Sequence, residues 1–210
     1  MQYIELKNNL RDFLVVSNKD LKKEDPDFHV QRLTDWQNKG YLKKVTRGYY
    51  IFSDTEIDEN VLYITANEIY DPSYVSLESA LSHYNLIPEG VYSVTSVSSK
   101  KTITLKTPFG DFNYKKIKPE LMFGYALVRY KNHNFKMAEM EKAILDYFYI
   151  NAKAKDDDDF FEMRFNAPIF KESVDMDKFE RYLKAFNNKS MEKRIRKFLK
   201  FINNADYRTN

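Results

Sequence analysis

Residues that could carry out catalysis are dispersed along this sequence. The histidines His29, His83 and His133 lack metal-binding spacing, and the chain has no cysteine to complete a zinc site. Consecutive aspartates at 156–159 could attract Mg²⁺, but neighbouring carboxylates repel one another and are typical of a solvated acidic loop. Neither a Gly-rich phosphate loop nor a GxSxG motif is present. The sequence therefore predicts a protein without enzymatic activity, metal or cofactor.

Polyanion binding is the chemistry that the charges favour. The net charge is only +3, but basic and acidic residues are separated into blocks along the chain. Residues 1–52 contain more Lys and Arg than Asp and Glu, whereas residues 53–89 contain acidic residues and no Lys or Arg. Phosphate binding requires several cations on one face, while an isolated charged block is also compatible with an ordinary solvated surface. Which alternative holds depends on whether the helices and strands place these cations on one face of the protein.

The N-terminal part begins with two predicted helices. Apolar residues from Ile4 to Leu14 recur with helical spacing and predict a first helix that ends near Val16. Ser17 and Asp20 have the spacing of a capping box, which predicts a short second helix through about residue 24.

A third helix and a hairpin are expected next. Asp25 followed by Pro26 predicts a helix start, and the helix is expected to end near residue 38. Its apolar anchors are Phe28, Val30, Leu33 and Trp36. The following YLKKVTRGYYIF segment predicts a β-hairpin with Gly48 in its turn.

Three helices followed by a hairpin predict a winged helix-turn-helix, which reads the major groove with its third helix and touches phosphate with its wing. Gln31 and Arg32 are the candidates for reading base edges, whereas Asp27 and Asp35 reduce the positive potential of this segment. The expected DNA-contacting residues are Lys22, Lys23, His29, Gln31, Arg32, Lys39, Lys43, Lys44 and Arg47. A purely structural or protein-binding winged helix remains an alternative.

A polar, acidic segment at 53–58 predicts a boundary between residues 1–54 and a second domain, 55–210. We expect this second domain to combine a small antiparallel sheet with flanking helices, so that the whole chain is α+β. Strands are expected at 74–75, 92–97, 103–106, 112–116, 125–130 and 134–137. Helices are expected at 61–69, after Ser76, at 139–149, and as an amphipathic pair within 176–202.

The last predicted helix, SMEKRIRKFLKFI, is strongly basic. Its cations are Lys193, Arg194, Arg196, Lys197 and Lys200. They are candidates for a second phosphate-binding surface, but they also fit the solvent face of a helix that buries its apolar side. The sequence leaves both interpretations open.

The N-terminal winged helix, YDPSYVSLESAL, SVTSVSSKKT, TPFGDFNYKKIKP and AEMEKAILDYFY occur in an order that resembles AbiEi-type antitoxins of type IV toxin–antitoxin (abortive infection) systems. The resemblance covers roughly residues 10–149. It implies an N-terminal domain that represses its own operon at inverted repeats, with two copies on one operator. It also implies a C-terminal domain that counteracts a nucleotidyltransferase-like toxin without forming a stable complex. No motif assigns the antitoxic residues.

Two other functions remain as alternatives. One is a transcriptional regulator without a toxin partner, whose C-terminal domain senses a ligand or mediates dimerisation. The other is a nucleic-acid-processing enzyme that uses the aspartates at 156–159, or Glu139 and Glu141, as metal ligands. The lack of cysteine, of a signal-peptide core and of long apolar runs predicts a cytoplasmic protein that does not contact membranes.

Overall fold

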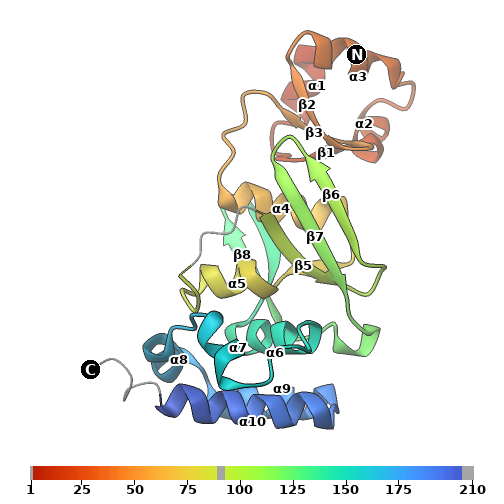
Figure 1. Ribbon diagram of the computed structural model, residues 1–210. Helices are drawn as coiled ribbons and strands as arrows, with labels where there is room; N and C mark the ends of the chain where they lie inside the picture. Colours follow the sequence, from red (N-terminus) through yellow and green to blue (C-terminus); the bar gives the residue numbers. More distant parts are fainter. Residues whose placement is uncertain (1, 89–92, 205–210) are drawn as a thin grey trace.

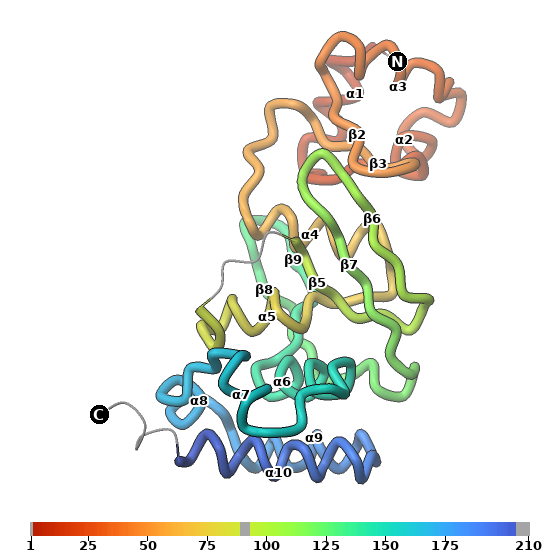
Figure 2. Tube along the Cα trace, in the orientation of Figure 1, coloured from red at the N-terminus to blue at the C-terminus, as the bar shows by residue number. Residues whose placement is uncertain are grey.

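The computed structural model describes residues 2–88 and 93–204, which form a mixed α+β structure. Figure 1 shows the N-terminal elements at one end, a twisted sheet in the middle and the C-terminal helices at the opposite end. The trace in Figure 2 follows the same succession of layers. The expected α+β class, with antiparallel strand pairs and flanking helices, is confirmed in this coarse form.

The N-terminal elements, here called the N-terminal unit (residues 2–54), comprise short helices and strands. Their bounds are α1 Tyr3–Asn9, β1 Val16–Ser17, α2 Asn18–Glu24, α3 Gln31–Asn38, β2 Leu42–Thr46 and β3 Tyr49–Phe52. The strands form an antiparallel sheet in the order β1-β3-β2. The predicted hairpin is confirmed as β2 and β3, and Gly48 in its turn has a φ of +83°, which favours glycine.

The predicted capping box also forms at the start of α2. Ser17 Oγ accepts a hydrogen bond from the Asp20 N–H at 3.2 Å, and the Asp20 carboxylate accepts one from the Ser17 N–H at 2.8 Å. The first helix was predicted too long, because α1 ends at Asn9 and Val16 instead pairs with Tyr50 in the sheet. Local periodicity does not reveal this pairing, which involves a residue far along the chain.

The predicted start of the third helix at Asp25 and Pro26 is wrong. The Asp25 N–H closes α2 by donating to the Leu21 carbonyl at 2.9 Å, and the chain then turns so that Phe28 is buried. Helix α3 consequently begins at Gln31. Burial of an aromatic side chain outweighs the local preference of an Asp-Pro pair for a helix start.

The second part of the chain contains the larger sheet and the remaining helices. Its elements are α4 Glu59–Ile69, β4 Ser73–Val75, α5 Leu77–His83, β5 Ser93–Ser98, β6 Ile103–Thr107, β7 Gly110–Lys116, η1 Pro119–Leu121, β8 Tyr125–Tyr130, β9 His133–Ala138, α6 Met140–Ile150, α7 Asp157–Glu162, α8 Ala167–Ser173, α9 Met176–Phe186 and α10 Lys189–Asn204. The expected strand at 92–97 is confirmed from Ser93 onward, and residue 92 lies outside the described residues.

The larger sheet has the strand order β6-β7-β5-β4-β9-β8. The β5–β7 and β4–β9 pairs are parallel, whereas the other neighbours are antiparallel. Helix α4 packs on one face, where Tyr114 of β7 donates a hydrogen bond to the Ala66 carbonyl at 2.8 Å. On the other face, Tyr74 of β4 donates to the Asp146 carboxylate of α6 at 2.9 Å. Helices therefore contact both faces of this sheet.

The aspartates at 156–159 begin a helix instead of forming the expected loop. Asp156 is the N-cap of α7, and its carboxylate accepts a hydrogen bond from the Asp159 N–H at 3.2 Å. Carboxylates in the first turn interact favourably with the positive end of the helix dipole. This interaction offsets the mutual repulsion on which the loop prediction was based.

Buried side chains form two clusters that meet at the β2–β3 hairpin. The smaller cluster lies within the N-terminal unit and includes Leu33, Trp36 and Tyr50. The larger cluster extends through the second part of the chain, yet it also includes Val45 and Ile51 of the hairpin. The small sheet is therefore covered on both faces. Within the described residues, no helix has the length and apolar character needed to cross a membrane.

Candidate nucleic-acid interface

The residues expected to contact DNA are carried by α2, α3 and the β2–β3 hairpin, which pack around the smaller buried cluster. Figure 1 shows these elements together at the N-terminal end of the molecule. The exposed members of the set are Lys22, Lys23, His29, Gln31, Lys39, Lys43, Lys44 and Arg47. The structure thus presents them to solvent on one compact unit.

Helix α3 has one buried side and one exposed side. Leu33 and Trp36, one turn apart, face the core, whereas Gln31 is exposed. Arg32 is half-buried, so it is less accessible than the expected groove-reading role assumes. Val30 was predicted to be an apolar anchor, but it is the N-cap residue and its side chain is 43% exposed. The late start of α3 rotates Val30 out of the core.

The hairpin turn is anchored to the start of α2. The Asn18 N–H donates a hydrogen bond to the Gly48 carbonyl at 2.9 Å. A Cβ atom at position 48 would lie 3.4 Å from the Asn18 side-chain nitrogen, an ordinary contact distance, so the positive φ and not a lack of space favours glycine here. Arg47, next to Gly48, is therefore held at a defined position relative to α2.

Six of the cations expected to contact DNA are exposed and accessible to a ligand. Within the described part of the chain, no ion pair involves Lys22, Lys23, Lys39, Lys43, Lys44 or Arg47. A phosphate that binds these groups would not have to displace an internal carboxylate. This distinguishes them from Arg194 and Arg196, the arginines of the basic helix α10.

Helix α10 uses its arginines for internal contacts. Arg194 is half-buried and donates hydrogen bonds to the carbonyls of Phe148 at 2.8 Å and Asn151 at 3.0 Å, which lie at the C-terminal end of α6. Burial lowers the pKa of its guanidinium group. Arg196 pairs with Glu180 of α9 and, at 3.3 Å, with Glu192. Both arginines therefore connect helices.

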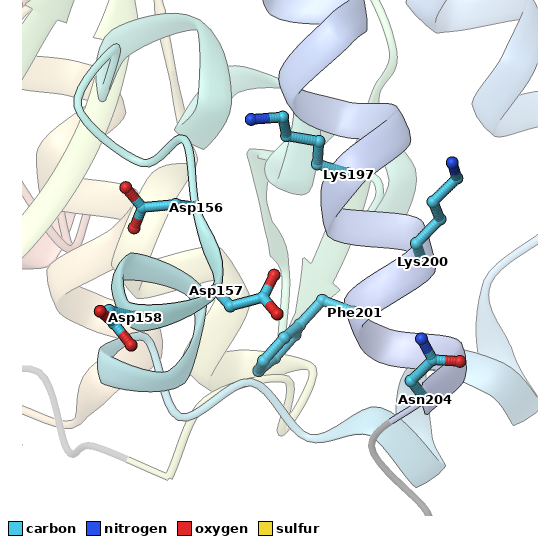
Figure 3. A pocket seen from close by; sticks show the side chains of 7 residues that line it. All are labelled: Asp156, Asp157, Asp158, Lys197, Lys200, Phe201 and Asn204. Carbon is cyan, nitrogen blue, oxygen red and sulfur yellow. The ribbon is translucent and has the colours of Figure 1, made fainter.

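The lysines of α10 face an acidic wall. Lys197 and Lys200 line a groove of about 560 Å³, and the aspartates that begin α7 line its opposite side (Figure 3). Lys197 also donates a hydrogen bond to the Lys155 carbonyl at 3.4 Å. Lys193 is exposed. The groove therefore places opposite charges near each other.

A buried polar network in the second part of the chain was missed by the sequence analysis. Lys142 and Asp146 on α6 form an ion pair and are both 0% exposed. Asp146 also accepts hydrogen bonds from Tyr74 and Ser76 at 2.9 Å, and Lys142 donates to Tyr74 at 2.8 Å. The signal that could have revealed it is a Lys and an Asp four residues apart within an otherwise apolar helix.

Burial governs the electrostatics of this network. It lowers the pKa of Lys142 and raises that of Asp146, because each charged form loses its hydration. The mutual attraction and the hydroxyls of Ser76 and Tyr74 oppose these shifts. The network connects two of the sequence stretches discussed above, SLESAL and EKAILD, across the face of the sheet.

Glu139 and Glu141, which were candidates for metal ligands, form hydrogen bonds and ion pairs with other residues of the protein. Glu139 accepts a hydrogen bond from Tyr182 at 2.5 Å, and Glu141 accepts one from the Asp175 N–H at 3.0 Å. Lys178 forms ion pairs with both glutamates, at 3.7 and 3.1 Å. Among residues 2–88 and 93–204, no group of three or more His, Asp or Glu side chains is arranged to hold a metal ion.

Comparison with known proteins adds no assignment. No protein-family model matches the chain, and no curated protein matches its sequence.

Proposed function

We propose that the chain is a transcriptional autorepressor that binds duplex DNA through an N-terminal winged helix (residues 1–54), and that residues 55–210 act as an antitoxin of the type IV class. The order α1-β1-α2-α3-β2-β3, with the sheet order β1-β3-β2, supports the winged-helix assignment. In this assignment α3 is the recognition helix and the β2–β3 turn is the wing.

The observation that carries the DNA-binding proposal is that cations of the N-terminal unit are exposed and, within the described part of the chain, without an internal carboxylate partner, in contrast to the arginines of α10. The exposed lysines of α2, the lysine that ends α3 and the hairpin cations lack internal carboxylate partners among the described residues, whereas Arg194 and Arg196 of α10 are engaged. Phosphate contacts position such a domain on DNA, and base contacts give it specificity. Gln31 is the exposed α3 side chain best suited to reading adenine through its amide.

The antitoxin part of the proposal rests on the resemblance to AbiEi-type antitoxins. The structural support is indirect: Ser76 of SLESAL and Asp146 of EKAILD, which are far apart in sequence, are joined by a hydrogen bond of 2.9 Å. These stretches therefore define a common core. The proposed partner is a nucleotidyltransferase-like toxin that is counteracted without a stable complex.

DNA binding is tested with a labelled duplex from the region immediately upstream of the reading frame and an unrelated duplex of equal length. Fluorescence anisotropy at fixed salt is expected to give at least about 10³-fold tighter binding to the upstream duplex. Equal affinities for both duplexes would contradict autorepression, and no binding to either would contradict the DNA-binding proposal.

The antitoxin role is tested by the growth of cells that express the adjacent reading frame, with and without the full-length chain. Growth arrest by the neighbour alone and rescue by co-expression are expected. The combined variant Lys43→Ala, Arg47→Ala is the control, because it should lose repression and still rescue growth when the neighbour has an independent promoter. Arrest without rescue would contradict the antitoxin role.

A further inference from the structure

The β2–β3 hairpin belongs to two cores at once. Its strands alternate, so that Leu42, Tyr50 and Phe52 join the cluster of the N-terminal unit. Val45 and Ile51, on the opposite face, belong to the larger cluster of the second part of the chain. Ile51 is 0% exposed. Around Val45 and Ile51, the face of the hairpin that points away from α1, α2 and α3 is therefore sealed by the rest of the protein, while Lys43 on the same face stays exposed.

The contact surface on the second part involves β6. Strand β2 lies against β6. Tyr49 of β3 packs against the larger cluster. Figure 1 shows the tip of the β6–β7 hairpin reaching the N-terminal strands.

The same hairpin carries the exposed cations Lys43, Lys44 and Arg47. Lys43 lies two residues before Val45 on β2 and pairs in register with Ile51, so a shift of the sealed face displaces the cation beside it. At the turn, the Asn18–Gly48 hydrogen bond of 2.9 Å fixes only the tip of the hairpin. The rest of the hairpin is held by the pairing of β3 with β1 and by its two packed faces.

We propose that Val45, Tyr49 and Ile51 are positioning residues for DNA binding: their packing on the C-terminal core holds the wing where its cations meet phosphate. This inference rests on the proposed DNA-binding function. According to this inference, the second part of the chain takes part in DNA binding. The affinity for DNA then depends on how the larger cluster packs against the hairpin. A change in the core at β6 or β7 would move the wing cations relative to α3.

The test compares Ile51→Ala with Ile195→Ala in the full-length chain. Both remove the same atoms from a side chain that is 0% exposed in the larger cluster, but Ile195 lies on α10, at the end opposite the wing (Figure 1). Binding to the upstream duplex is measured from about 50 to 200 mM salt, where the slope of log K against log salt becomes shallower by about 0.9 for each phosphate that is no longer neutralised. Circular dichroism gives the folded fraction at each temperature.

Ile51→Ala is expected to weaken binding and flatten the salt slope, whereas Ile195→Ala should keep the wild-type slope. A purely structural role would only lower the folded fraction, which leaves the slope unchanged. If Ile51→Ala does not fold, Tyr49→Leu provides the same comparison, and Ile51→Val should restore the slope in either case. Wild-type slopes in the Ile51 and Tyr49 variants overturn this inference alone, while absence of binding by the wild type overturns the proposed function as well.

Discussion

Lys142 and Asp146 lie one turn apart on α6 and pair with each other where neither side chain is exposed to solvent. The network is completed by Tyr74 and Ser76, which reach it from β4 and the start of α5. The Lys142 ammonium also lies 4.8 Å from the centre of the Phe186 ring, which brings α9 into the same contact. One ion pair thus joins the sheet to helices on its α6 side.

Removal of one partner of this pair should be strongly destabilising. Lys142→Met leaves a buried carboxylate without its cation and is expected to lower the free energy of unfolding by about 3–5 kcal/mol. The double variant Lys142→Met, Asp146→Leu removes both charges and should recover a large part of this loss. Urea unfolding measures both values, and a double variant no more stable than the single one would contradict the expectation.

Gly124 should not tolerate a side chain. Its φ is +67°, and an added Cβ would lie 2.9 Å from Tyr182 Cε2 and 3.1 Å from Lys142 Cγ. Gly40 is a matched control, because its φ is +71° and nothing lies within 4 Å. Gly40→Ala should cost about 1–2 kcal/mol from backbone strain alone. Gly124→Ala should cost about 1–3 kcal/mol more from overpacking, and equal losses in urea unfolding would contradict this steric argument.

The stability of the chain should fall on acidification, in part through Asp58. Burial raises the pKa of this carboxyl, but the hydrogen bonds from Tyr130 and from the Val61 N–H outweigh it, so the net pKa is lowered. A lowered folded pKa stabilises the protein above the unfolded value of about 3.9, and this stabilisation is lost as the pH falls through the folded value. Thermal unfolding from pH 7 to 3 should show a shallower decline for Asp58→Asn, whose side chain still caps α4. Identical pH profiles would exclude this contribution.

The wing cations should contribute affinity without sequence preference. The double variant Lys43→Ala, Arg47→Ala is expected to weaken binding to the upstream and the unrelated duplex alike, and to reduce the salt slope by about 0.9 for each phosphate that these cations neutralise. Anisotropy titrations at several salt concentrations measure this. An unchanged slope would place the wing outside the interface. Lys200→Ala, in the groove beside α7, is the control and should leave the slope unaltered.

Gln31 should contribute specificity. Gln31→Ala is expected to weaken binding to the upstream duplex by about 1–3 kcal/mol and to leave the unrelated duplex nearly unaffected. The side chain is exposed, so the substitution should not change the melting temperature. Equal losses on both duplexes would indicate that Gln31 touches phosphate, and no loss on either would indicate that it does not contact DNA. Arg32→Ala should behave in the same way if Arg32 reads bases despite its partial burial.

Local signals in the sequence predicted local structure well. The capping box at Ser17 and the hairpin at Gly48 each depend on residues within a few positions, and both form. The start of α3 was misplaced for two reasons. Asp25 is the C-cap residue of α2, and Phe28 is buried in a core that other segments of the chain also form. Alternation located the strands, but the parallel pairing of β5 with β7 depends on the order of strands across the whole sheet.

In the candidate site, too, features that depend on neighbouring residues could be predicted and features that depend on distant residues could not. The exposed cations of the N-terminal unit could be identified from a short stretch of sequence, because exposure follows from the helical and strand periodicity. The internal role of Arg194 could not, since its acceptors are carbonyls at the end of α6, more than forty positions earlier in the chain. The pair of Lys142 and Asp146 has a local signal, their spacing of four residues, but the further partner Tyr74 lies on a strand 68 residues away and could not be predicted in this way.

The sealed outer face of the β2–β3 hairpin limits how this protein can be re-engineered. The N-terminal unit, excised at about residue 54 and grafted onto another protein, would carry Val15, Val45 and Ile51 into water. Such a chimera should aggregate unless these positions are made polar or the new partner supplies a matching apolar surface. Specificity is therefore best altered by exchanging the exposed residues of α3 alone, which leaves both faces of the hairpin as they are.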